Sequence, residues 1–161
     1  MKRLIPFAIA LAGLPGVAVA QGAVRSCAGM DQALPVELQP WQTAVTAGAT
    51  LPPGTTVNLT LRPIAEIEAV APPRPARQGA TTGGRIELEI ATAGTYGVAL
   101  GNAGWIDVVR DGRPLEATAH GHGPACSTIR KIVNFNLTPG RYTVQISGTD
   151  ASVVRLLVLP R

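Results

Sequence analysis

The sequence has 161 residues, of which 46% are hydrophobic and 15% are charged. This composition excludes wholesale disorder, and a chain of this length is expected to form a single domain. Aromatic residues make up 4% of the chain, which argues against an aromatic platform for nucleic acid. The formal net charge is +4 and falls to +2 without Lys2 and Arg3. A charge this small does not indicate a polyanionic partner, so we expect no nucleic acid to bind.

Residues 1–20 have the pattern of a secretory signal peptide. Lys2 and Arg3 precede a mostly apolar stretch, and residues 18–20 (Ala-Val-Ala) form a small-x-small cleavage pattern. The apolar run is short and contains two prolines, which favours a signal peptide over a membrane anchor. We therefore expect a mature chain that starts at Gln21, is periplasmic or secreted, and has no membrane span.

The two cysteines are Cys27 and Cys126. Because an exported chain meets an oxidising compartment, we expect them to form a disulfide. The bridge would close a loop of about 100 residues, for which chain entropy gives a stabilisation of roughly 4–5 kcal/mol. The alternative is a Cys126 thiolate that acts as a metal ligand or a nucleophile.

After the signal peptide, residues 21–55 contain several prolines and are expected to be irregular, because proline interrupts helices. Leu38, Trp41 and Val45 are the apolar residues of this segment that we expect to cover one end of a core. A folded domain over residues 56–161 would follow.

From Thr56 onward, apolar and polar residues alternate in short runs separated by Gly, Pro and Asp-Gly turns, which is typical of half-buried strands. Asp111-Gly112 is a strong signal for a two-residue hairpin, whereas residues 72–84 and 120–128 are predicted to be loops. Seven or eight strands favour a single antiparallel β-sandwich of jelly-roll type, with a small barrel as the alternative. The predicted strands cover residues 56–62, 85–91, 96–100, 105–110, 115–119, 129–137, 141–147 and 152–159.

Two similar motifs open strands in the second half of the chain. Residues 93–96 read Ala-Gly-Thr-Tyr, residues 138–142 read Thr-Pro-Gly-Arg-Tyr, and the Asp111-Gly112 hairpin lies between them. In these features the segment 94–159 resembles bacterial pre-peptidase C-terminal domains. The resemblance implies a jelly-roll-like sandwich that serves as an accessory or envelope module without catalysis of its own.

A second resemblance rests on residues 105–112, 119–124 and 126–131. In these stretches the chain is similar to a family of short exported proteins from sphingomonad-type alphaproteobacteria, for which no role is established. Some similar chains carry the label homogentisate 1,2-dioxygenase. Enzymes with that activity are much longer and cytoplasmic, and they hold iron with two histidines and a glutamate. This chain has two histidines in total, so its residues do not support the label.

The two histidines, His120 and His122, form the one chemically distinctive motif of the sequence. Residues two apart in an extended segment lie on the same side, so both imidazoles could share a copper, zinc or nickel ion. Further ligands would have to come from Cys126, Asp107, Glu116 or the backbone. The competing interpretation is a glycine-rich loop with two exposed imidazoles.

Asp107 and Lys131 are predicted to form an ion pair. If Asp111-Gly112 is a two-residue loop, Asp107 lies opposite Glu116, which is unfavourable, and about 13 Å from His120, too far for a shared ligand. A nearby cation would relieve this repulsion. Lys131 lies on an otherwise apolar face of its strand, and pairing with Asp107 near the edge of the sandwich would explain both residues.

These features lead to three functional hypotheses. The first is a non-enzymatic, disulfide-linked envelope or binding module, whose partner would be a protein or carbohydrate of the cell envelope. The second is a small periplasmic metal-binding protein that holds Cu or Zn through His120 and His122. The third is an enzyme with the dioxygenase activity, which would need a third ligand beside the two histidines; the sequence shows none and no catalytic triad.

Overall fold

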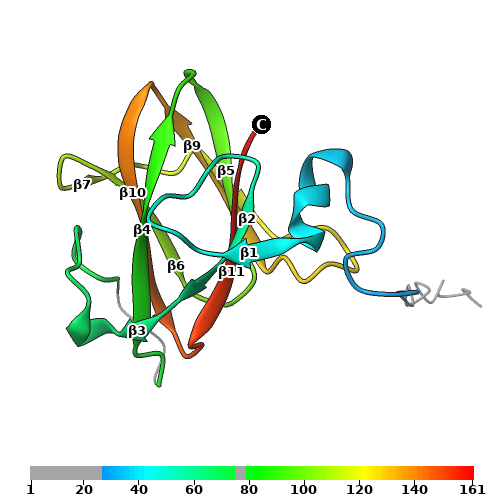
Figure 1. Ribbon diagram of the computed structural model, residues 1–161, viewed down its shortest axis with the longest axis horizontal. Coiled ribbons are helices and arrows are strands. Elements are labelled where there is room, and N and C mark those ends of the chain that lie inside the picture. The colour runs from blue at the N-terminus through cyan, green and yellow to red at the C-terminus, as the bar shows by residue number, and fades with distance from the viewer. Residues whose placement is uncertain (1–26, 75–78) are drawn as a thin grey trace, which may run out of the picture.

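A computed structural model describes residues 27–74 and 79–161. The predicted signal peptide, residues 1–20, lies outside these ranges. The described chain forms two β-sheets that pack face to face, and the view in Figure 1 shows both sheets with one further segment on the outside of each. Within the described residues, no helix has the length and apolar character needed to cross a membrane.

One sheet, here called sheet A, has the strand order β1-β2-β11-β5-β9-β8. Its neighbouring strands are antiparallel, except that β1 and β2 run parallel. The strands of sheet A are β1 (Ala44–Thr46), β2 (Thr56–Thr60), β5 (Gly94–Leu100), β8 (Ala119–Gly121), β9 (Lys131–Leu137) and β11 (Val153–Pro160).

The other sheet, sheet B, has the order β3-β4-β10-β6-β7 and is antiparallel throughout. The strands of sheet B are β3 (Arg62–Pro63), β4 (Thr82–Ile90), β6 (Trp105–Arg110), β7 (Arg113–Pro114) and β10 (Gly140–Thr149). Two short 3₁₀ helices, η1 (Val36–Gln42) and η2 (Ile64–Glu66), lie outside the sheets.

The predicted antiparallel β-sandwich is confirmed. Seven of the strands have five or more residues, and each coincides with one predicted from alternation. The inner faces of the two sheets meet in one core, because the apolar residues of each strand recur at every second position. The core residues include Val57, Leu59, Ile86, Leu88, Ile90, Val98, Leu100, Ile106, Val108, Val133, Phe135, Val144, Ile146, Leu156 and Val158.

The hairpin predicted at Asp111-Gly112 is also confirmed. Arg110 pairs with Arg113 across the turn, and both turn residues have positive φ, 51° at Asp111 and 72° at Gly112. This is the backbone of a type I′ turn, which suits the twist of the flanking strands.

The structure corrects the prediction for residues 115–119. The return strand after the hairpin ends at Pro114, and the chain then crosses to sheet A, where β8 pairs with β9. Proline at 114 has no N–H for a longer ladder with β6. This crossing brings an edge strand of sheet A beside the edge of sheet B.

The structure also corrects the predicted loop over residues 72–84, because β4 begins at Thr82. Gly83 and Gly84 are buried within the strand rather than in a turn. A Cβ at Gly83 would lie 2.6 Å from the Ile146 carbonyl oxygen. These glycines therefore serve close packing, which the sequence does not distinguish from flexibility.

The N-terminal segment covers the outer face of sheet A, on the right of the sandwich in Figure 1. Trp41 is fully buried there, and its Nε1 donates a hydrogen bond of 2.8 Å to Thr128 Oγ1. Leu38 and Trp41 are buried as predicted, but they lie on the outer face of sheet A and not at one end of the sandwich core, whereas Val45 is half exposed, on β1. The apolar cluster under this segment consists of Leu34, Leu38, Trp41, Ala99, Ile129, Ile132, Leu157 and Leu159.

The predicted disulfide between Cys27 and Cys126 is present, with a Cα–Cα distance of 5.4 Å. It joins the start of the N-terminal segment to the loop before β9. Asp31 reinforces the junction, since its backbone N–H donates to the Cys126 carbonyl and its carboxylate accepts hydrogen bonds from the N–H and hydroxyl of Thr128.

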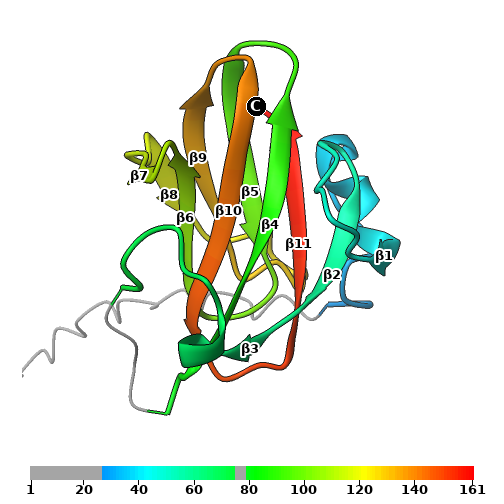
Figure 2. The same cartoon turned by 60° about the vertical axis from the view of Figure 1, so that its left-hand side comes forward.

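The segment after η2 covers the outer face of sheet B, and Figure 2 shows it beside β10 and β6. Gln145 of β10 faces outward but is fully buried, because this segment lies over it. The Gln145 side chain accepts hydrogen bonds from the N–H groups of Val70 and Ala71 and donates to the Ala71 carbonyl. These bonds hold the segment on the sheet as far as Arg74.

Candidate functional site

A pocket of about 560 Å³ lies between the edges of the two sheets. Its walls come from β6 of sheet B, from β8 and β9 of sheet A, from the crossing connection after β7, and from the segment that covers sheet B. The lining residues are Arg74, Trp105, Ile106, Ala117, His120, Gly121, His122, Lys131 and Val133.

Trp105, the first residue of β6, forms an aromatic wall of the pocket and is 42% exposed. Two cationic groups lie near its ring: Arg74 Cζ and Lys131 Nζ are each 5.5 Å from the ring centroid. Such contacts are attractive because the face of an indole carries negative charge density. Both positive groups are therefore within cation–π distance of the ring at the pocket, and Arg74 and Lys131 also interact electrostatically with each other.

Asp107 contacts Arg74 and is only 3% exposed. It faces outward from β6 on the same side as Trp105, as strand alternation requires. Its Oδ1 accepts a hydrogen bond of 2.8 Å from Arg74 Nε, whereas its Oδ2 has no hydrogen-bond partner among the described residues. A buried carboxylate of this kind requires a nearby positive charge, and Arg74 supplies it directly.

Lys131 opens β9 at the edge of the core and is partly buried. Burial lowers the pKa of its ammonium group; the negative charge of Asp107 acts in the opposite direction, and the positive charge of Arg74 lowers the pKa further. Within the described part of the chain, no hydrogen bond or ion pair engages this ammonium group.

Asp107 therefore has a different ion-pair partner from the predicted Lys131. The direct ion pair of Asp107 is with Arg74, while Lys131 interacts with Asp107 electrostatically, beyond ion-pair distance. Arg74 reaches Asp107 because the segment over sheet B is fixed by Gln145, the residue that pairs with Asp107 in the neighbouring strand. Strand alternation contains no information about this covering segment, so the sequence did not point to Arg74.

The expected repulsion between Asp107 and Glu116 does not arise. The ladder between β6 and β7 ends at Val109 and Pro114, and Leu115 makes one more hydrogen bond, from its N–H to the Val108 carbonyl. The chain leaves sheet B there, so Glu116 does not pair with Asp107.

His120 and His122 both line the pocket, as their spacing on an extended segment predicts. His120 pairs with Val133 in the sheet, and His122 Nδ1 lies 3.4 Å from the Arg130 carbonyl oxygen. Cys126 is in the disulfide, and neither Asp107 nor Glu116 lines the pocket. In residues 27–74 and 79–161, no group of three or more His, Cys, Asp or Glu side chains could hold a metal ion.

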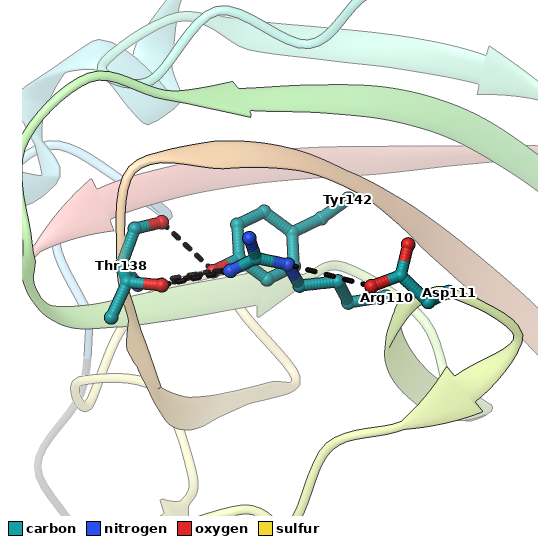
Figure 3. Close-up of polar contacts among 4 residues, drawn as sticks. All are labelled: Arg110, Asp111, Thr138 and Tyr142. Atoms are coloured by element: carbon teal, nitrogen blue, oxygen red, sulfur yellow. Dashed lines mark hydrogen bonds and ion pairs between the residues drawn. The ribbon is translucent and has the colours of Figure 1, made fainter.

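A second polar cluster lies away from the pocket, at the turn before β10 (Figure 3). The Tyr142 hydroxyl donates to the Thr138 carbonyl at 2.8 Å and accepts from the Thr138 N–H and from Arg110 Nη1. Arg110 also lies 3.9 Å from Asp111. Burial raises the pKa of Tyr142, but the hydrogen bonds from Thr138 and Arg110 outweigh it and lower the pKa overall. These groups satisfy one another, so the cluster fixes the turn.

Three chains among the solved structures match this chain. The chain is similar to the pre-peptidase C-terminal domain of a collagenase from Bacillus anthracis, with 15% identity and a TM-score of 0.42. The aligned part covers 72% of this chain and 94% of that domain. No model of a protein family matches the chain, and no curated protein matches it either. The assignment as a β-sandwich rests on the strand order and register described above.

Proposed function

We propose that the protein is an exported, non-catalytic binding module of the cell envelope, and that its ligand binds in the pocket beside Trp105. The observation that carries this proposal is the composition of the pocket. It combines an accessible indole, apolar walls from Ile106 and Val133, and an ammonium group without a hydrogen-bonding partner in the described chain. Concave sites that combine apolar walls with few polar groups are typical of ligand binding.

Export is supported by two features. The disulfide between Cys27 and Cys126 suits an oxidising compartment, and the pattern of residues 1–20 is that of a signal peptide. In the envelope, the natural partners of such a module would be a protein or a carbohydrate that presents a small group to the pocket.

The metal-binding alternative has one observation in its favour, because His120 and His122 line the same pocket. The charges beside them oppose it. Arg74 and Lys131 place two cations at the pocket, and the one carboxylate among these groups, Asp107, is already paired with Arg74. A divalent cation would be repelled by these groups, so we favour the binding module.

The test is a ligand screen that compares variants of one wall. Ala117 is exposed and lines the pocket, so Ala117→Trp should fill it. Ala119 is exposed and does not line the pocket, which makes Ala119→Trp the matched control. Ligand-observed NMR with a library of small carboxylates, amides and neutral sugars should give ligands that bind the wild type and the control but not Ala117→Trp.

Two results would contradict the proposal. One is a library in which no compound distinguishes the wild type from Ala117→Trp. The other is chemical turnover of a bound compound, which would make the protein an enzyme. The mass of the protein isolated from the periplasm tests export separately, since we expect a chain that starts at Gln21.

A further inference from the structure

The charges around Trp105 are unbalanced in a way that indicates the chemistry of the ligand. Arg74, Asp107 and Lys131 bring two positive groups and one negative group together. The negative group is buried and engaged with Arg74 Nε. One positive charge therefore remains without a counterion in the described structure, and it lies at the pocket wall rather than in bulk solvent.

Lys131 carries that charge under unfavourable conditions. Burial removes part of its hydration, and the neighbouring Arg74 adds like-charge repulsion; both effects lower the pKa of its ammonium group. Lysine at the edge of an apolar core usually extends its ammonium group into water. Here the group is instead held 5.5 Å from the centre of the Trp105 ring.

Arg74 has donors that are not used by Asp107. Its Nε makes the 2.8 Å contact with the carboxylate, and its side chain is 50% exposed at the pocket. In the described residues, its terminal Nη groups make no hydrogen bond. A guanidinium fixed through Nε presents these remaining donors in a constant direction, which suits planar anions such as carboxylates.

The rest of the wall is apolar. Ile106, Ala117 and Val133 provide no side-chain donor or acceptor, so a hydroxyl-rich ligand would lose hydrogen bonds to water on entering. A ligand with an apolar body would gain from the same surface. The wall therefore favours a carboxylate joined to a hydrocarbon group over a sugar acid.

We propose that the pocket binds an organic carboxylate, with its anionic group between Arg74 and Lys131 and its apolar body against Ile106, Ala117 and Val133. This inference rests on the proposed function and specifies the ligand class. An anion at this position would supply the missing counterion of Lys131 and reduce the repulsion between the two cations. The buried Asp107 holds Arg74 in place and acts as a positioning residue.

The experiment compares matched pairs of probes on the full mature chain. Benzoate and hexanoate are the carboxylates, benzamide and hexanamide are their neutral counterparts, and glucuronate is the hydroxyl-rich acid. Tryptophan fluorescence can report binding, because Trp41 is fully buried and Trp105, the other tryptophan, lines the pocket. We expect each carboxylate to bind at least about tenfold more tightly than its amide, the size of one charge-assisted hydrogen bond.

Variants of the two cations give the decisive result. Lys131→Gln and Arg74→Gln should each weaken benzoate binding by about tenfold and leave benzamide binding unchanged. Lys131→Arg should retain most of the affinity, because it keeps the charge. The control is Arg141→Gln, since Arg141 is exposed and does not line the pocket. Urea unfolding of each variant shows whether the fold is retained.

Three outcomes would overturn the inference. Equal affinity for benzoate and benzamide would show that the pocket does not recognise an anionic group. Tighter binding of glucuronate than of benzoate would show that the pocket does not select an apolar body. Binding of Cu²⁺ or Zn²⁺ that is lost in His120→Ala, without any carboxylate binding, would assign the pocket to a metal. In the first two of these cases a compound that is excluded by Ala117→Trp would still support a binding module, so the two proposals fail separately.

Discussion

The outer faces of the two sheets are covered in chemically different ways. Over sheet A, the N-terminal segment is attached through apolar side chains such as Leu38 and Trp41 and through the disulfide. Over sheet B, the segment from η2 to Arg74 is attached through the amide of Gln145 and the carboxylate of Asp107. The two covers lie on opposite sides of the sandwich (Figure 1).

This difference separates a cover that extends the apolar core from a cover that ends at the proposed binding pocket. Apolar burial needs no exact geometry, and its stabilisation grows with buried area, so the cover of sheet A extends the core. Buried polar groups require defined partners, and their arrangement is fixed in detail. The cover of sheet B ends beside the pocket with Arg74 oriented by Asp107, which suits a site that must present a donor at a defined position.

Trp41→Ala should have the largest effect, because it removes the centre of the apolar cover. Truncation of a fully buried tryptophan costs about 3–5 kcal/mol, and here the hydrogen bond to Thr128 is lost as well. Urea unfolding would measure the loss. Trp105→Ala, at the partly exposed tryptophan, should cost much less. Equal losses would show that the cover of sheet A is not part of the core.

Loss of the disulfide should be the next largest effect. Cys27→Ser combined with Cys126→Ser should lower the free energy of unfolding by about 2–5 kcal/mol, since the bridge closes a loop that spans most of the described chain. Benzoate binding should persist under conditions where the variant is folded, because neither cysteine lines the pocket. A folded variant that does not bind benzoate would show that the disulfide affects the pocket although it does not line it.

Gln145→Leu tests the polar cover. The change leaves the N–H groups of Val70 and Ala71 without their acceptor, which should cost about 1–3 kcal/mol. We expect faster hydrogen exchange at these two amides and weaker benzoate binding, since Arg74 loses its support. Gln39→Leu is the control, because Gln39 is exposed. Unchanged exchange in Gln145→Leu would mean that Gln145 does not hold the segment.

The smallest expected effect is a pH dependence of benzoate affinity. The pKa of Lys131 lies below 10.5, chiefly because the group is buried. As the pH rises toward 10.5, Lys131 should lose its proton earlier than an exposed lysine does, and the affinity should fall. The charged and titratable groups around it are Arg74, Asp107, His120 and His122. Lys131→Arg should abolish the fall, and a fall that persists in this variant would exclude Lys131 as its origin.

Much of the fold could be predicted from residue patterns, because the relevant information is local. Alternation with a period of two placed the long strands and assigned Asp107 and Trp105 to one face of β6. The pair Asp111-Gly112 identified a hairpin, because few residues adopt two successive positive φ angles easily. The pairing of Cys27 with Cys126 followed from the presence of two cysteines in a chain expected to be exported.

The candidate site could be predicted only in part. The spacing of His120 and His122 placed both on one side of an extended segment, and both line the pocket. Nothing in the pattern indicated that Arg74, in a proline-rich stretch, would reach Asp107, which lies 33 positions further along the chain. The crossing from β7 to β8, which brings the two sheet edges together, was equally absent from the prediction.

The sequence by itself therefore determined the seven long strands, one turn and the facing of individual side chains, since these depend on neighbours along the chain. It determined the disulfide for a different reason, because the chain has two cysteines. The tertiary structure alone decided that Arg74, Trp105 and Lys131 meet at one pocket. They come from a covering segment and from two different sheets, and their convergence depends on packing between elements that are distant in sequence. Such packing is set by the total of many long-range contacts, which no local pattern of residues records.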